Sequence, residues 1–267
     1  MNLGLSGKVA VVTGASRGIG KAIALAFAQE EVKVALCARG KDALLATARE
    51  IAQKGGNAEV FPLDVRRPEG IRCAIGQILC RWGVIDILVN NAGGPLGASN
   101  FLDLSDARWQ ATIDLNLLSV IRLCREVIPS MQRRQGGRII NIASVAGRQI
   151  GPSLSDYGVA KSAVLSLTKY LALEFARENI KVNAVTPGAV WTSSWESEAV
   201  SRAARDGLPL EEATRRLIHE TSAGIPLGRM GDPDDIAALV LFLASERSGW
   251  ITGSCFTIDG GTVKSVY

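Results

Sequence analysis

The chain has 267 residues, of which 47% are hydrophobic and 21% charged, and its formal net charge is +4. The basic residues form no tract, which argues against nucleic acid as a partner, and the longest apolar run, residues 236–244, is too short to span a bilayer. An odd number of cysteines without a Cys-x-x-Cys pair and a single histidine, His219, disfavour disulfides and His/Cys metal sites. We therefore expect one domain over residues 1–267 of a cytoplasmic protein, without a metal and without a nucleic-acid or membrane partner.

The first predicted unit is a strand, a glycine loop and a helix. Residues 8–13 are mostly apolar, GASRGIG follows at 14–20, and a helical periodicity begins at residue 21. Three glycines in such a loop permit a tight turn, close approach of the backbone to a pyrophosphate and close packing of the helix. The spacing is G-x-x-x-G-x-G, not G-x-G-x-x-G, yet the position between strand and helix favours a dinucleotide phosphate site over an ordinary turn.

The second predicted strand, residues 32–39, ends where NAD-binding sheets carry an acidic residue for the adenosine ribose. Ala38 occupies that place, so the carboxylate is missing. Arg39 is adjacent and Arg17 lies in the glycine loop, and two guanidiniums can clasp a 2′-phosphate. This pattern favours NADP, with two solvated surface arginines as the alternative.

Helices and strands continue to alternate. We expect a helix over 41–54, a strand over 58–65 that carries Asp64, a helix over 68–82 and a strand that runs from 85 into NNAGG at 90–94. Amides and glycines at a strand end suit a cofactor pocket, although a simple turn has the same composition.

A long helix is predicted over residues 106–134, with Asn116 among leucines. A buried asparagine costs free energy unless its amide is hydrogen-bonded. Asn116 is therefore either a structural bridge or a member of a proton relay.

The stretch with the clearest chemistry is residues 144–161. Ser144 ends an apolar strand, so its hydroxyl would emerge at the carboxyl edge of a sheet, where it can hydrogen-bond a carbonyl oxygen. If a helix starts near Ser155, Tyr157 and Lys161 stand at i and i+4 on one face. One cation about 4 Å away supplies the roughly 4 kcal/mol that lowers a tyrosine pKa from about 10 to about 7. A lone Tyr-x-x-x-Lys would otherwise indicate ordinary surface packing.

The last part of the chain adds strands at 180–188 and 254–259 and a helix over 235–245. Seven strands with helices between them predict an α/β fold, a doubly wound parallel sheet of the Rossmann type with helices on both faces. The segment 189–227, with Trp191, Trp195 and a charged helix, is expected to bind the substrate. The two tryptophans suggest a hydrophobic, ring-bearing substrate, and core or interface packing explains them equally well.

The helix over 157–177 carries apolar residues almost all the way round, and the helix before it shows the same excess. A monomer would leave a large apolar patch exposed on these helices. We therefore expect a symmetric homo-oligomer, unless the 189–227 segment folds over the patch.

Together, these motifs resemble the short-chain dehydrogenase/reductase family over nearly the whole chain. The resemblance is carried by TGASRGIG, Asp64, NNAG, Asn116, Ser144, Tyr157, Lys161, Pro187-Gly188 and IDGG near the end. It implies hydride transfer between NADP(H) and a small-molecule carbonyl/alcohol pair, without a metal, and usually a homotetramer. The subgroup it looks most like is the bacterial 3-oxoacyl-carrier-protein reductases and their secondary-alcohol relatives.

The resemblance also assigns roles to residues. It implies that Tyr157 is the acid/base, that Lys161 holds the nicotinamide ribose and lowers the tyrosine pKa, and that Ser144 binds the substrate oxygen. Asn116 would position a water, Asp64 would touch the adenine and Thr192 the carboxamide. The implied cofactor site comprises Gly14, Ser16, Arg17, Gly18, Ile19, Gly20, Arg39, Asp64, Val65, Asn91, Ala92, Gly93, Tyr157, Lys161, Pro187, Gly188, Val190 and Thr192.

Two departures from the carrier-protein reductases bear on the substrate. Leu173 stands where those enzymes usually have an arginine, and the loop after NNAG is longer and richer in glycine. We therefore place a carbonyl or secondary-alcohol substrate first and a 3-oxoacyl-carrier-protein second. A non-catalytic NADP-binding sensor is disfavoured because Asn116, Ser144, Tyr157 and Lys161 are all present, and an epimerase or dehydratase is a further alternative.

Overall fold

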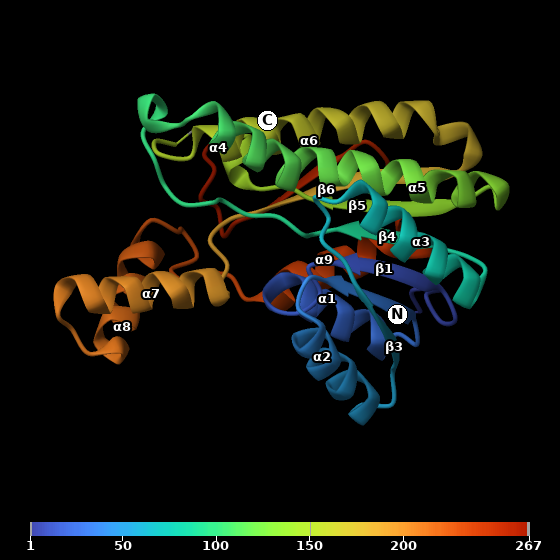
Figure 1. Ribbon diagram of the computed structural model, residues 1–267, viewed down its shortest axis with the longest axis horizontal. Helices are drawn as coiled ribbons and strands as arrows, with labels where there is room; N and C mark the ends of the chain where they lie inside the picture. The colour runs from blue at the N-terminus through green and yellow to red at the C-terminus, as the bar shows by residue number, and fades with distance from the viewer. Residues whose placement is uncertain (1, 150, 266–267) are drawn as a thin grey trace.

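The computed structural model describes residues 2–149 and 151–265, so residues 1, 150, 266 and 267 of the predicted domain lie outside it. Within the described residues, one parallel sheet has the strand order β3-β2-β1-β4-β5-β6-β7 (Figure 1). The strands are β1 (Val9–Thr13), β2 (Lys33–Ala38), β3 (Asn57–Pro62), β4 (Ile87–Asn90), β5 (Gly137–Ile142), β6 (Ile180–Pro187) and β7 (Cys255–Ile258). The predicted seven-stranded, doubly wound sheet is confirmed.

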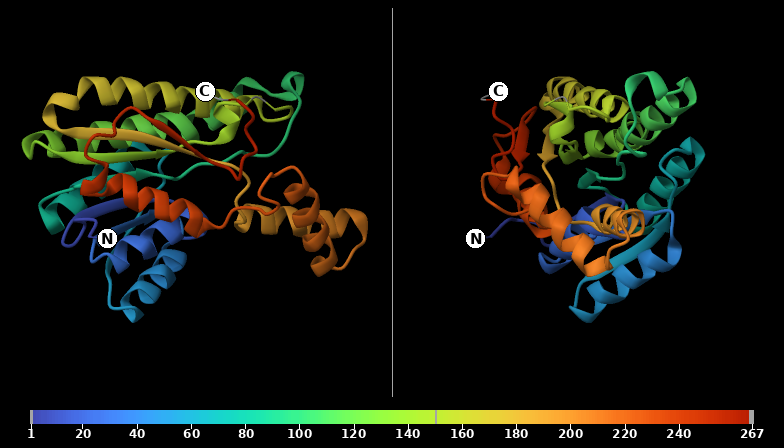
Figure 2. Two further views of the ribbon diagram at one scale, coloured as in Figure 1. Left: turned by 180° about the vertical axis from the view of Figure 1, so that it is seen from behind. Right: turned by 90° about the vertical axis from the view of Figure 1, so that its left-hand side faces the viewer.

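Helices cover both faces of this sheet (Figures 1 and 2). The α-helices are α1 (Gly18–Gln29), α2 (Lys41–Gln53), α3 (Pro68–Trp82), α4 (Asp106–Ile113), α5 (Ser119–Arg133), α6 (Ser155–Glu174), α7 (Ser193–Asp206), α8 (Leu210–Ala223) and α9 (Pro233–Ala244). The short helical turns are η1 (Phe101–Asp103), η2 (Asp114–Leu118), η3 (Val145–Gly147), η4 (Ala176–Glu178) and η5 (Glu246–Ser248). No helix of the described residues is both long enough and apolar enough to cross a membrane.

The five inner strands of the sheet, β2, β1, β4, β5 and β6, are buried on both faces, which explains why they read as mostly apolar runs. All five residues of β1 are buried. On one face, α1, α2 and α9 enclose a core that includes Phe27 and Val240, and on the other, α3, α5 and α6 enclose a core that includes Ile75 and Val164.

The strand order changes direction at β1, which pairs in parallel with β2 on one side and β4 on the other. Crevices of this kind, at the carboxyl ends of the strands, are where open α/β sheets bind ligands. The segments that follow β1, β4, β5 and β6 all start at this edge, and they contain most of the predicted site residues.

Two predicted segments differ in detail from the structure. The expected helix over 106–134 is interrupted by η2, a π-helical turn that contains Asn116. The segment 189–227 forms two helices, of which α7 was not predicted, and they project from the body of the molecule (Figures 1 and 2). An Arg202–Glu220 ion pair of 2.7 Å joins these two helices to each other.

The cysteines are free thiols. Cys37 and Cys124 are buried, and burial raises the pKa of each thiol to about 12. Cys73 and Cys80 are exposed on the solvent side of α3.

Candidate active site

The glycine loop after β1 packs too tightly for larger side chains at two positions. A Cβ added at Gly20 would lie 2.3 Å from the Gly14 carbonyl oxygen, and one at Gly14 would lie 2.7 Å from Nδ2 of Asn91. Gly14 also has a φ of 68°, in the left-handed region that favours glycine. The backbone therefore folds closely into the N-terminus of α1, where free N–H groups and the helix dipole favour a phosphate.

The NNAG loop after β4 is fastened to the glycine loop by Thr13, the last residue of β1. Its Oγ1 accepts hydrogen bonds from the backbone N–H groups of Asn91 at 2.9 Å and Ala92 at 3.0 Å, and it donates to the Val89 carbonyl at 3.2 Å. The Asn91 side chain donates to the Thr13 carbonyl at 2.9 Å. The ends of β1 and β4 thus form one rigid edge of the crevice.

Arg17 and Arg39 lie exposed near the carboxyl ends of β1 and β2, and Ala38 ends β2 without a carboxylate. In residues 2–149 and 151–265, neither guanidinium forms an ion pair with a carboxylate. Two exposed, uncompensated arginines beside a dinucleotide loop fit an additional phosphate.

Asp64 lies two residues beyond the end of β3, and Arg66 holds its carboxylate. Arg66 donates through Nη2 to Oδ2 at 2.6 Å and through Nε to Oδ1 at 3.0 Å. The Arg66 hydrogen bond lowers the pKa of Asp64 to about 2, and the charge of Arg39 contributes to the same effect. The carboxylate is therefore ionised and acts as a hydrogen-bond acceptor at neutral pH. The adjacent Val65 is buried.

The structure brings Ser144 and Tyr157 together from β5 and α6. Ser144 follows β5 and caps η3, where its Oγ accepts from the Ala146 N–H at 3.1 Å. Burial raises the pKa of Tyr157, and its hydrogen bond with the Ser144 side chain partly offsets this. The phenol is therefore protonated at neutral pH, which is the form that can donate to a carbonyl oxygen.

Lys161 is buried one turn after Tyr157, with only 4% of its surface exposed. Its Nζ donates to the Ile142 carbonyl at 2.8 Å and lies 5.7 Å from the centroid of the Tyr157 ring. Burial lowers the pKa of Lys161 to about 8. The expectation that this ammonium lowers the tyrosine pKa is wrong for this geometry, because Nζ points to the end of β5 and burial dominates at the phenol.

Asn116 is fully buried in the π-helical turn. Its Oδ1 accepts from the Gly94 N–H at 2.9 Å, and its Nδ2 donates to the carbonyls of Gly94 and Thr112, each at 3.1 Å. A Cβ on Gly93 would lie 2.7 Å from Oδ1 of Asn116 and 3.4 Å from Nζ of Lys161. Asn116 is thus a structural bridge to the NNAGG loop, on the same side of the sheet as the lysine.

The segment after β6 closes the crevice from another side. Pro187 ends β6, and the Gly188 N–H donates to the Ile258 carbonyl at 3.0 Å. Val190 is buried and forms an isolated parallel β-bridge with Gly231. A Cβ on Gly18 would lie 3.2 Å from Cγ2 of Thr192. Thr192 therefore lies over the glycine loop, beside the half-buried Ser16 and Ile19 that belong to the same turn.

Sequence reasoning missed three buried polar residues around this site, Thr13, Thr112 and Asp156. Thr13 ends a fully apolar strand, a position that could have drawn attention to it. Asp156 directly precedes Tyr157, but its side-chain partners lie more than forty positions away, with a separation of 44 residues for Thr112 and 48 for Arg108.

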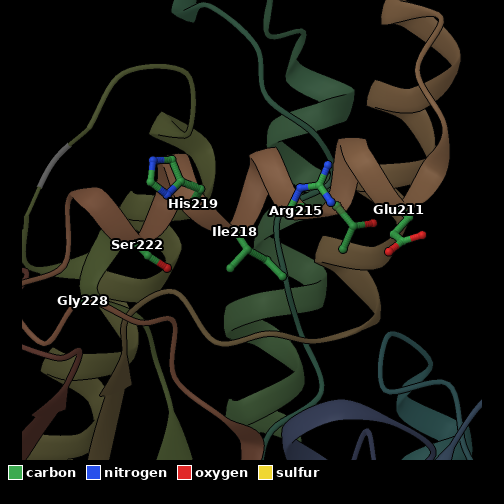
Figure 3. Close-up of a pocket in the computed structure, with 7 residues that line it drawn as sticks. Glu211, Arg215, Ile218, His219, Ser222 and Gly228 are labelled. Carbon is green, nitrogen blue, oxygen red and sulfur yellow. The ribbon is translucent and has the colours of Figure 1, made fainter.

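The projecting helix α8 bears a cavity of about 540 Å³ (Figure 3). Its lining comes from Glu211, Thr214, Arg215, Ile218, His219, Ser222 and Gly228. Ser144, Tyr157 and Lys161 do not line it, and His219 is exposed there. Among the residues that the structure describes, no cluster of His, Cys, Asp and Glu side chains is suited to a metal.

Comparison with known proteins identifies the family. The family model described as enoyl-(acyl carrier protein) reductase matches residues 14–263. The solved structure of a short-chain type dehydrogenase/reductase from Mycobacterium marinum is 37% identical, with a TM-score of 0.85 over 99% of this chain and 98% of that chain. The chain belongs to the short-chain dehydrogenase/reductase family. The resemblance inferred from the motifs is confirmed.

Two further members of the family are similar over almost their full lengths. The 3-oxoacyl-(acyl-carrier-protein) reductase FabG of Thermotoga maritima is 36% identical over 97% of this chain and 99% of its own. The L-sorbose reductase of Gluconobacter frateurii, solved as a complex with NADPH and L-sorbose, is 35% identical with a TM-score of 0.94 over 100% of both chains.

Proposed function

We propose that this oxidoreductase transfers a hydride between NADPH and a small carbonyl or secondary-alcohol substrate, with Tyr157 as the proton donor and acceptor. The observation that carries the proposal is the meeting of three side chains at the carboxyl end of β5. There the Tyr157 phenol is hydrogen-bonded with Ser144, and buried Lys161 lies one turn along the same helix. NADPH supplies the hydride when bound, and the residues of the chain handle the proton.

The residues of the crevice fit such a cofactor. Gly14, Gly18 and Gly20 place the N-terminus of α1 against the phosphates, and Arg17 and Arg39 are free to pair with a 2′-phosphate. We assign the adenine end to Asp64 and Val65. We assign the nicotinamide end to Asn91, Ala92, Gly93, Pro187, Gly188, Val190, Thr192, Tyr157 and Lys161.

The proton chemistry follows from the geometry of Ser144 and Tyr157. Two hydroxyls at one point can hold a carbonyl oxygen, and the protonated phenol donates to it as negative charge develops. Lys161 presents a cation beside the phenol and can bond a ribose hydroxyl. Asn116 holds the NNAGG loop through Gly94, so we assign it the positioning of that loop and of a water in a proton relay.

The substrate class is the part of this proposal that a direct assay decides. Oxidation of NADPH at 340 nm is followed with ketoses, simple ketones, aldehydes, quinones and 3-oxoacyl thioesters. We expect free carbonyl compounds to be turned over best, since Leu173 stands at the position where carrier-protein reductases usually have an arginine. A preference for the thioesters would favour the second candidate, a 3-oxoacyl-carrier-protein reductase, to which the similarity with FabG points.

The cofactor preference can be reversed at the end of β2. In the double variant Ala38→Asp with Arg39→Leu, we expect kcat/KM with NADPH to fall and that with NADH to rise. The introduced carboxylate accepts from a ribose diol and repels a 2′-phosphate. Steady-state kinetics with both cofactors measures the change, which we expect to reach about 100-fold in the NADPH/NADH ratio, or about 2.8 kcal/mol, within the range of one charge-assisted hydrogen bond. Equal efficiency with NADH in the unmodified protein would contradict the assignment.

We also propose a homotetramer that is built on α5 and α6. On α6, Tyr170 and Leu173 are 73% and 71% exposed, and Leu167 and Leu171 are only partly covered. Projecting α7 and α8 leave this surface open (Figure 1). Apolar surface of this kind is normally covered by a second copy in a symmetric assembly.

Changing Leu173→Glu should dissociate this assembly, because a carboxylate would be buried against its own symmetry mate. Light scattering at micromolar concentration gives the mass. The control is Leu102→Glu, at a position that is 93% exposed in η1, the short helical turn before α4. A mass near 28.3 kDa for the unmodified protein would mean that it is a monomer.

Residues 1–267 are proposed as a single catalytic domain in which 189–227 recognises the substrate. A cytoplasmic location is part of the same proposal, supported by the free thiols.

A further inference from the structure

A buried carboxylate lies directly beside the proposed proton donor. Asp156 is the second residue of α6 and is only 2% exposed. A buried charge is costly unless several groups compensate it. Asp156 has three such partners, and they come from two different elements of the fold.

The three partners of Asp156 form hydrogen bonds with both oxygens of its carboxylate. Oδ1 accepts from the backbone N–H of Tyr157 at 2.8 Å, while Oδ2 accepts from Oγ1 of Thr112 at 2.6 Å and from Nε of Arg108 at 3.0 Å. Burial raises the pKa of this carboxyl, but the bonds from Thr112, Tyr157 and Arg108 outweigh it and lower the pKa below its ordinary value. The group is therefore a permanent anion between α4 and the first turn of α6.

The network continues from these partners to the other parts of the site. Arg108 also donates through Nη2 to the Gly97 carbonyl at 2.7 Å, so it ties the loop after β4 to Asp156. The Thr112 carbonyl accepts from Nδ2 of Asn116 at 3.1 Å, and Asn116 holds Gly94. The anion thus connects the proposed proton donor with both ends of the Gly94–Gly97 turn.

Besides the bond between the Tyr157 phenol and Ser144, the side-chain hydrogen bonds that hold the first turn of α6 in the described residues are those of Asp156. The residue before the helix is Leu154, which offers no side-chain cap, and the first turn has Asp156 as its one acidic residue. The loop before α6 is attached to the loop after β4 by a hydrogen bond from the Ser99 N–H to the Ser153 carbonyl at 2.9 Å. The place of the Tyr157 ring relative to Asn116 and to the loop therefore depends on Asp156.

We propose that Asp156 is a positioning residue which, through Arg108 and Thr112, sets the place of Tyr157 relative to Asn116 and the Gly94–Gly97 turn. This inference depends on the proposed function, in which Tyr157 delivers the proton. Asp156 itself does not touch the reacting atoms. Its removal relaxes the first turn of α6 and the loop together, and the Tyr157 phenol then spends less time in the productive geometry.

The variant Asp156→Ala tests this. Misplacement of a reacting group by about 1 Å can cost about 100-fold, so we expect kcat to fall by about 10- to 100-fold with NADPH affinity changed less than about threefold. The isotope effect with deuterated NADPH should rise, since hydride transfer becomes slower than the other steps. Backbone hydrogen exchange should accelerate at residues 94–99 and 155–158 but not in β1 or α1. The control is Arg81→Gln, which breaks the Arg81–Glu59 pair of 2.6 Å far from the site and should leave all these quantities unchanged.

A second pair of variants separates positioning from packing. Thr112→Val keeps the shape of the buried side chain but removes the hydroxyl that bonds Asp156, whereas Thr112→Ser keeps the hydroxyl. We expect Thr112→Val to lower kcat and to accelerate backbone hydrogen exchange in the same two segments. In Thr112→Ser we expect both quantities to stay near those of the unmodified protein. If Asp156→Ala does not fold, this pair decides alone.

The outcomes are distinct. Unchanged kcat and isotope effect in Asp156→Ala, equal losses in the two Thr112 variants, or exchange that accelerates evenly over the whole chain would each overturn the positioning role. Failure of the unmodified protein to oxidise NADPH with any carbonyl compound would overturn the proposed function instead. Hydrogen exchange needs no substrate, so it still reports on the Asp156 network in that case.

Discussion

Replacing Tyr157 with phenylalanine is expected to lower kcat by about 1,000-fold, within the range of about 100- to 10,000-fold that general acid–base catalysis contributes. The substitution removes one hydroxyl and keeps the ring. Ser144 retains its bond from the Ala146 N–H, and Lys161 retains its bond to the Ile142 carbonyl, so the surroundings of the ring are held by other contacts. We therefore expect the fold and the affinity for NADPH to be preserved.

Stopped-flow or steady-state absorbance at 340 nm measures the turnover of Tyr157→Phe, and fluorescence titration measures NADPH binding. The chain provides a matched control in Tyr170, which lies on the same helix but is 73% exposed. Tyr170→Phe should keep kcat within about twofold, because it removes a hydroxyl more than three turns along the helix from Tyr157 and keeps the aromatic ring. A Tyr157→Phe variant with more than a few per cent of the original turnover would mean that another group delivers the proton.

The parts of the site that the sequence predicts are those built from short-range geometry. The spacing of Tyr157 and Lys161 fixes them on one face of a helix, and the glycines between β1 and α1 require a tight turn wherever the strand and helix form. The apolar runs predict the strands because both faces of the sheet are covered. These features do not depend on which distant segment comes to lie beside them.

The parts that the sequence did not predict are set by long-range packing. The Thr13 hydroxyl meets the Asn91 N–H across 78 positions, and Arg108 meets Asp156 across 48. The i, i+4 spacing brings the Lys161 ammonium near Tyr157, but the direction of its hydrogen bond is decided by the end of β5, where the Ile142 carbonyl accepts it. This difference explains why the residues were predicted together while the expected effect on the tyrosine pKa was wrong.

Replacing Lys161 with methionine should impair two properties at once. Its Nζ is buried beside Tyr157, where a cation can bond a ribose hydroxyl and so hold the cofactor against the phenol. Loss of a preorganised donor typically costs about 100- to 1,000-fold in kcat, and loss of a charged hydrogen bond about 1.5–3 kcal/mol of binding. We therefore expect kcat to fall by about 100-fold and NADPH affinity by about tenfold. Unchanged values of both would contradict both assigned roles.

The same variant should change how stability depends on pH, in the absence of NADPH. Burial lowers the pKa of Lys161 from 10.5 to about 8, so between these values the unfolded chain binds more protons than the folded one. The unfolding free energy of the unmodified protein therefore gains from this group as pH rises from about 8 to 10.5. At about 1.36 kcal/mol per pKa unit, the gain in unfolding free energy relative to Lys161→Met is about 3 kcal/mol.

Urea unfolding of both proteins at pH 7.5 and at pH 10 measures this difference, and the comparison cancels groups that titrate alike in both. If Lys161→Met and the unmodified protein respond equally to pH, the ammonium is solvated in the folded state. A buried lysine that reduces stability at neutral pH but is needed for turnover is best explained by its place in the active site, because packing alone would favour an apolar side chain there.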